Sequence, residues 1–168
     1  AVSSHRTYPG SIAVAVTKEG LTLVSMYSVL EEEYAIKTLQ RHLSDLTPLF
    51  DSPLGRYVIL AGDFNISTQC PEPTRSRHRN AVERIQSFGL IDAFALDRSH
   101  RKPLSGCPRG DHPCRHVQTQ RHDRSRIRWQ NDYFFISKNL SAKVMSCHVI
   151  HEGYSWSLSD HCPIVQDF

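Results

Sequence analysis

Three apolar stretches of the chain each carry, at one end, side chains that can orient water, move a proton or donate to an anion. The stretches are YVILA, followed by Asp63 and Asn65; YFFIS, preceded by Asp132; and CPIV, preceded by Asp160 and His161. Taken singly, the polar residues at the end of each stretch could simply form a turn, because Gly, Asp and Asn favour turns. Together they suit acid–base chemistry, since a buried strand is a rigid mount for polar groups.

The elements that would position these groups alternate between strands and helices. Residues 11–28 predict a hairpin around the turn at 18–20, and residues 57–61 predict a buried strand. Residues 31–50 predict an amphipathic helix, with Glu31–Glu33 at its amino-terminal end. Residues 80–89 predict a short helix capped by Asn80 and stopped by Gly89. With two further strands at 131–137 and 142–150, the pattern is that of an α/β or α+β sandwich.

Size and composition are those of one globular domain. The chain has 168 residues, 39% hydrophobic and 22% charged, so we expect a single soluble domain over residues 1–168 with a real core. No apolar run reaches the roughly 20 residues that cross a bilayer, and no signal segment is recognised at the start. A cytoplasmic protein without membrane partners is therefore expected.

Charge is distributed unevenly although the net charge is only +3. Residues 98–128 contain nine Arg and Lys against Asp111 and Asp123, with little hydrophobic periodicity. This long basic loop suits a polyanion, with a solvated loop as the alternative. Its candidate contacts to substrate phosphates are Arg115, Arg121, Arg124 and Arg126, and Trp129 could stack on a base or simply pack.

The five cysteines are scattered and odd in number, which favours reduced thiols over a disulfide scaffold. The same basic loop concentrates thiol and imidazole groups within sixteen residues. Cys107, Cys114, His116 and His122 could hold a structural zinc ion. Their spacing is uncommon for zinc, so a loop that binds phosphates through its arginines is the preferred interpretation.

The ordered motifs GDFN, NDYFF and SDHCPI resemble the endonuclease/exonuclease/phosphatase superfamily, which includes abasic-site endonucleases and deoxyribonuclease I. The similarity runs from about Ile12 to the carboxyl terminus. It implies a β-sandwich flanked by helices, of the four-layer type, and hydrolysis of phosphate esters with Mg²⁺ or Mn²⁺.

The resemblance also implies roles for individual residues. Asp63 would position and activate the attacking water, and Asn65 would bind the scissile phosphate. His161, oriented by Asp132, would contact the phosphate or transfer a proton. Asp160 would lie at or near a metal position. A weaker match places Tyr27 where it would face the phosphate, although a surface-edge aromatic residue is an equally good interpretation of Tyr27.

The chain departs from the family pattern at its amino-terminal side, where the family carries an Asn and a metal-binding Glu. Neither motif is present, and Glu19 and Glu31–Glu33 are not convincing substitutes. We therefore expect only the carboxyl-terminal portion of the fold, no well-formed Mg²⁺ site within this chain alone, and reduced or absent activity. Because half a sandwich would expose an apolar sheet face, self-association or a partner chain is a further expectation.

The functional prediction is a metal-dependent phosphoester hydrolase, with DNA phosphodiesters as the preferred substrate because of the basic loop. One alternative is a phosphatase for a small phosphorylated metabolite or lipid headgroup. Another is a catalytically silent relative that binds nucleic acid. The sequence does not discriminate endonucleolytic from exonucleolytic cleavage.

Overall fold

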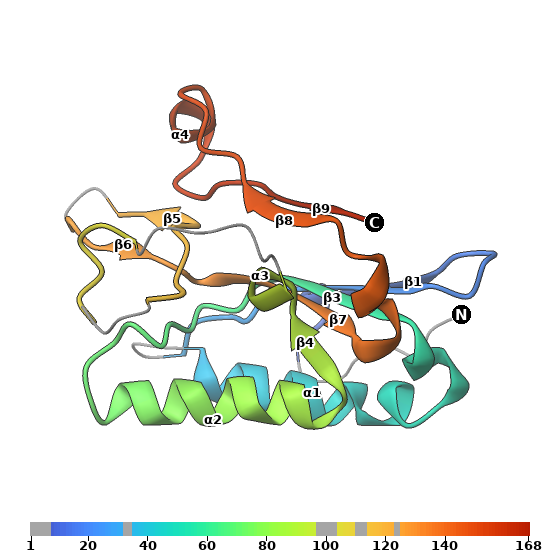
Figure 1. Cartoon of the computed structure of the whole chain (residues 1–168). Coiled ribbons are helices and arrows are strands. Elements are labelled where there is room, and N and C mark those ends of the chain that lie inside the picture. The colour runs from blue at the N-terminus through green and yellow to red at the C-terminus, as the bar shows by residue number, and fades with distance from the viewer. Residues whose placement is uncertain (1–7, 32–34, 97–103, 110–113, 123–124) are drawn as a thin grey trace.

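A mixed α/β structure is built around one five-stranded sheet (Figure 1). The computed structural model describes residues 8–31, 35–96, 104–109, 114–122 and 125–168. Strand order in the sheet is β1-β2-β3-β7-β4. The strands are β1 (Ile12–Val16), β2 (Thr22–Met26), β3 (Val58–Asp63), β7 (Asp132–Ser137) and β4 (Leu90–Asp92).

Strand direction places the ends of the sheet. β1 and β2 form the predicted antiparallel hairpin, whereas β2 and β3 run parallel because α1 (Ile36–Phe50) connects them. β7 runs antiparallel to both β3 and β4. The first residue of β7 therefore lies beside the last residue of β3, at the same end of these two interior strands.

Two helices, α1 and α2 (Thr74–Ser87), cover one face of the sheet (Figure 1). The predicted apolar stripe of α1 is confirmed, since Leu39, Leu43 and Leu46 are fully buried. They pack in one core with Val24 and Met26 of β2 and with residues of β3 and β7. Each such leucine contributes about 1.5–3 kcal/mol through burial, which fixes the sheet against the helices.

Both helices begin elsewhere than predicted. α1 starts at Ile36 instead of residue 31, and Glu31 precedes it, accepting hydrogen bonds from Thr38 Oγ1 and Arg41. α2 starts at Thr74 instead of residue 80, because its first turns are polar and carry no periodic apolar signal. Its end is as predicted: Gly89, at φ +77°, follows the last turn.

The other face of the sheet is partly covered by the antiparallel pair β8 (Ser146–Val149) and β9 (Ile164–Asp167) (Figure 1). A small core joins this pair to the sheet through Phe134 of β7, Cys147 of β8 and Phe94 of α3 (Ala93–Leu96). Over β2 this face is more open, with Leu23 37% exposed. Self-association through it stays a prediction.

Short elements complete the described structure. The basic segment expected to be a loop contains a two-stranded ribbon, β5 (Gln120–Arg121) with β6 (Arg128–Trp129). A helix α4 (Ser155–Leu158) and 3-10 turns at Pro53–Arg56 and Lys138–Lys143 make up the rest. None of the described helices is long and apolar enough to cross a membrane.

Gly62, one residue before Asp63, allows β2 to approach β3 closely. It has φ +143°, and a Cβ at this position would lie 2.0 Å from the carbonyl oxygen of Met26. Gly62→Ala is therefore expected to lower the free energy of unfolding by about 2–4 kcal/mol. Gly20→Ala is the matched control, because Gly20 also has positive φ but an added Cβ meets nothing within 4 Å. Equal losses in urea denaturation of the two variants would contradict the close approach.

Candidate active site

Asp63 and Asp132 lie directly opposite each other on neighbouring antiparallel strands. Asp63 is the last residue of β3, Asp132 is the first of β7, and the two are paired in the strand register. Two like charges in this position repel each other, so the pair costs stability. A costly pair held on rigid strands is a feature of functional sites rather than of structural ones.

The GDFN turn is held in one conformation by its own hydrogen bonds. The backbone N–H of Asn65 donates to Asp63 Oδ1 at 2.9 Å, and Asn65 Nδ2 donates to the carbonyl oxygen of Ser28 at 3.0 Å. Asn65 adopts φ +48°, a left-handed conformation that Asn tolerates better than most residues. The Asp63 carboxylate and the Asn65 amide are thereby fixed relative to each other.

His161 joins the two carboxylates from a distant part of the chain. Its Nδ1 donates to Asp132, 2.9 Å from Oδ2 and 3.1 Å from Oδ1, and its Nε2 lies 4.0 Å from Asp160 Oδ2. The Asp132 contact fixes the ring orientation and keeps the proton on Nδ1. Nε2 is thus the nitrogen that can exchange a proton with a substrate.

Thr119 connects the segments that carry these groups. It is fully buried, its carbonyl accepts from Cys162 N at 2.8 Å, and its Oγ1 accepts from Asn131 N and Asp132 N at 3.1 Å each. One residue therefore positions Asp132 through its side chain and the residue after His161 through its backbone. The sequence alone does not single out Thr119, which lies in the basic segment predicted as a loop.

Burial and mutual repulsion shift the proton affinities of the cluster. Burial, followed by the Asp132 charge, raises the pKa of Asp63 from 3.8 to about 6, while the Asn65 N–H and His161 oppose this. The hydrogen bond to Asp132 raises the pKa of His161 above its usual value, against the opposing effect of burial. Near neutral pH Asp63 can therefore accept a proton, and the shift of the His161 pKa favours the protonated imidazole, as a base and an acid in one site require.

The oxygen-rich end of the cluster suits a hard cation. Donor atoms of Asp63, Asp132 and His161 lie within 4.8 Å of one another, and the Asp160 carboxylate is 64% exposed beside them. Mg²⁺ takes one or two carboxylates and fills its other positions with water and substrate oxygens. Asp63 and Asp132 supply two carboxylates to this group, and Asp160 lies outside it, 4.0 Å from His161 Nε2.

Tyr27 lies near the site by its backbone. It follows β2, and the next residue, Ser28, donates its N–H to the carbonyl of Asp63 and accepts from Asn65. The Tyr27 side chain is 48% exposed. A phosphate-binding role for Tyr27 stays a prediction.

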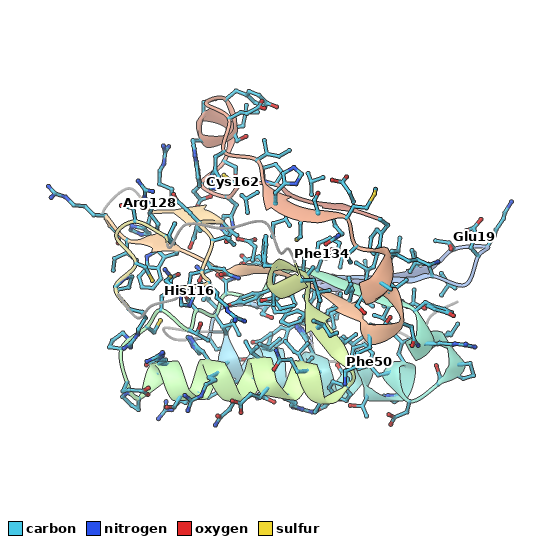
Figure 2. The ribbon with its side chains drawn as sticks, in the orientation of Figure 1. Glu19, Phe50, His116, Arg128, Phe134 and Cys162 are labelled. Atoms are coloured by element: carbon cyan, nitrogen blue, oxygen red, sulfur yellow. The ribbon has the colours of Figure 1, made fainter. Side chains whose placement is uncertain are left out.

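A pocket of about 220 Å³ adjoins the GDFN turn. Asn65 and Trp129 line it together with Leu30, Ser67, Cys70, Gln120, His122 and Asn131. A larger pocket of about 450 Å³ is lined by Glu19 and Phe168 among others. Figure 2 shows Glu19, in the β1–β2 turn, far from Cys162, the residue after His161. The larger pocket is therefore not the one beside the candidate catalytic residues. We take the smaller pocket as the substrate site because Asn65 lines it.

The predicted substrate-binding arginines are exposed where they are described. Arg115 and Arg126 are exposed, and Arg121 lies with its guanidinium 5.2 Å from the Trp156 ring and donates to the Trp156 carbonyl. Arg124 lies outside the described residues. Arg121 N also donates to the Asp160 carbonyl, which connects the basic ribbon to the site.

The predicted zinc ligands separate in space. Cys107, Cys114 and His116 form one group, with all three ligand atoms within 4.8 Å of one another. His122 is not in that group and instead lines the pocket beside Asn65. The four-residue set is therefore wrong as a unit, because His122 follows β5 and is carried toward the pocket.

Comparison with known proteins supports the same family. The sequence profile of the Endonuclease/Exonuclease/phosphatase family matches residues 4–161. No curated protein shows significant sequence similarity to the chain.

Solved structures share the fold at low identity. A 3′ phosphatase, NExo, from Neisseria bound to a product DNA hairpin superposes with a TM-score of 0.70 at 19% identity. A 3′-5′ exonuclease from Neisseria meningitidis gives 0.68 at 20%, and an AP endonuclease from Archaeoglobus fulgidus gives 0.64 at 17%. Each alignment covers 94% of this chain but only 64% of the other. The profile match and the shared fold agree: the chain belongs to the Endonuclease/Exonuclease/phosphatase family.

Proposed function

We propose that the chain is a metal-dependent phosphoester hydrolase that cleaves DNA phosphodiesters. The observation that carries the proposal is the convergence of Asp63, Asp132 and His161, from three separate segments, with their donor and acceptor atoms within 4.8 Å of one another beside Asn65. This set supplies a base for water, an acid for the leaving group and a donor for the phosphate.

Each residue has a role that follows from its surroundings. Asp63, with its raised pKa, accepts a proton from the attacking water near neutral pH. One N–H of the Asn65 amide is used by Ser28, which orients the second toward a phosphate oxygen. His161, held by Asp132, presents Nε2 to the leaving oxygen.

A divalent cation would complete the site. Mg²⁺ or Mn²⁺ would be held by Asp160 together with a carboxylate of the Asp63, Asp132 and His161 group, and when bound would neutralise charge on the phosphate. Because the Asp160 carboxylate is 64% exposed and lies outside that group, we expect weak binding, with activity that saturates only at metal concentrations on the order of millimolar.

The test is nicking of supercoiled plasmid by the purified chain with Mg²⁺ and Mn²⁺ titrated separately. Wild-type protein should nick, and His161→Ala should lose about 10²–10⁴-fold in rate. His148→Ala is the matched control, since His148 is an exposed histidine on β8 with a single neighbouring hydroxyl at 3.4 Å. No nicking by the wild type at any metal concentration would contradict the proposal for this chain.

A second candidate is removal of a terminal 3′ phosphate from DNA. It is favoured by the structural likeness to the enzyme from Neisseria that is described as a 3′ phosphatase. A duplex with a labelled 3′-phosphate end separates the candidates: loss of phosphate without chain cleavage would favour the phosphatase.

The basic segment, residues 98–128, is expected to bind the DNA backbone. Arg115→Ala, Arg121→Ala and Arg126→Ala should each weaken DNA binding and reduce the slope of log affinity against log salt by about 1. Arg56→Ala is the control, because Arg56 lies over Tyr57 next to β3, away from the ribbon. Fluorescence anisotropy at several salt concentrations measures the slopes. Unchanged slopes in all three variants would exclude the basic segment from the DNA interface.

A further inference from the structure

Two thiols and one imidazole converge outside the carboxylate cluster. Cys107 Sγ lies 3.5 Å and Cys114 Sγ 3.4 Å from the same atom, His116 Nδ1. All three atoms lie within 4.8 Å of one another. Six residues lie between the two cysteines in the sequence, and neither cysteine is in a disulfide.

The distances match those of a zinc site. With Zn–S about 2.3 Å and Zn–N about 2.0–2.1 Å, a tetrahedral ion separates S and N ligands by about 3.5–3.6 Å. The two observed separations are 3.5 and 3.4 Å, so one ion can bind all three atoms with little movement.

His116 is oriented as a metal ligand. Its Nδ1 faces both sulfurs, and its other nitrogen, Nε2, lies 2.8 Å from Thr68 Oγ1. A ligating histidine commonly donates its second N–H to an outer partner, which fixes the tautomer that leaves the first nitrogen unprotonated. Thr68 supplies that partner here.

The donor set differs in kind from the carboxylate cluster. Thiolate and imidazole select zinc, whereas carboxylates select magnesium. A divalent ion would displace both thiol protons to solvent and bind the two sulfurs as thiolates.

We propose that Cys107, Cys114 and His116 form a zinc site that joins the basic segment to the loop after Asn65. The three residues fill three of the four tetrahedral positions, and water would fill the fourth. This proposal is independent of the hydrolase function, because no residue of the carboxylate cluster takes part.

The site's contacts explain what zinc would stabilise. Gln69, 1% exposed, donates to the Arg128 carbonyl at 2.8 Å and accepts from Gln130 N at 2.7 Å, and its amide lies 3.6 Å from Cys107 Sγ. Thr68 and Gln69 follow the GDFN turn, while Arg128 and Gln130 precede Asp132. Zinc would therefore hold together the two segments that lead into the active site.

Metal analysis of the full chain, purified with reductant and with zinc and excess Mg²⁺ in the buffer, tests the proposal. We expect one zinc per chain in the wild type and a decrease of at least about tenfold in Cys107→Ser and His116→Ala. His122→Ala and Cys147→Ala should keep their zinc, because His122 lines the pocket and Cys147 is buried on β8. Zinc retained by Cys107→Ser and His116→Ala would overturn the site.

A second measurement needs no variant. Co²⁺ added to reduced, zinc-free wild-type protein should give the charge-transfer absorption of cobalt–thiolate bonds, and zinc should abolish it. Zinc should also raise the melting temperature of the wild type by about 5 °C or more, with Mg²⁺ present throughout. Absence of the absorption in the reduced protein, or a Cys107–Cys114 disulfide that forms in place of metal binding, would contradict the proposal.

Discussion

Asp63→Asn is expected to abolish most DNA cleavage while making the protein more stable at neutral pH. The variant keeps an oxygen that can accept the Asn65 N–H but loses the base, so the cleavage rate should fall about 10²–10⁴-fold. In the wild type, the rate should fall as pH decreases through about 6, because protonated Asp63 cannot accept a proton from water.

The gain in stability follows from the direction of the pKa shift. The pKa of Asp63 is about 6 in the folded protein against 3.8 for an unperturbed aspartate, so the folded state loses stability as pH rises between these values. Below pH 3.8 the Asp63 carboxyl group is protonated in both the folded and the unfolded state, so it does not lower the free energy of unfolding. Above about pH 6 it is ionised in both states, and the free energy of unfolding is lowered by the full amount.

Urea denaturation across this pH range measures the effect. After allowance for partial solvent exposure, Asp63→Asn should raise the free energy of unfolding by about 1–2 kcal/mol at pH 8, and the gain should shrink toward zero as the pH falls toward 4. Asp51→Asn, at an exposed carboxylate after α1, is the control and should change neither activity nor stability. A destabilised Asp63→Asn protein at pH 8 would show that the carboxylate has a structural role instead.

Asp132→Asn should be nearly as damaging to activity, for a different reason. An Asn amide can present its N–H to His161 Nδ1, which then cannot carry a proton, so the protonated imidazole that donates from Nε2 to the leaving oxygen is disfavoured. The substitution also removes the hydrogen bond to the Asp132 carboxylate, which is the largest cause of the raised His161 pKa. The expected decrease in cleavage rate is about 10²–10⁴-fold.

Two readouts separate this role from a general loss of structure. By NMR titration, the pKa of His161 should fall in Asp132→Asn relative to the wild type. Because Asp132 also raises the pKa of Asp63, the acid limb of any remaining activity should move to lower pH. An unchanged His161 titration would contradict positioning by Asp132.

Much of the fold could be predicted because its signals are local. The apolar stripe Leu39, Leu43 and Leu46 follows helical periodicity, and the β1–β2 hairpin surrounds Gly20 at φ +82°. The helix starts were wrong, since polar turns carry no periodicity. The ribbon of β5 and β6 was missed, because two-residue strands are defined by their pairing rather than by their own sequence.

The site could be predicted in its residues but not in its geometry. Asp63 and Asp132 stood out at strand ends, yet their direct opposition depends on the antiparallel register of β3 and β7. Thr119 gave no signal, since a threonine in a basic segment is common and its three bonds join residues up to 43 positions away. Long-range hydrogen bonds of this kind leave no pattern in one sequence.

The most direct measurement is the rate of phosphodiester hydrolysis on an end-labelled DNA duplex by four proteins: wild type, Asp63→Asn, His161→Ala and the double variant. If the two residues act as one unit, each single variant should lose most of the activity and the double variant should lose little more. Single variants that cleave within twofold of the wild type, or losses that simply multiply in the double variant, would contradict a shared catalytic site.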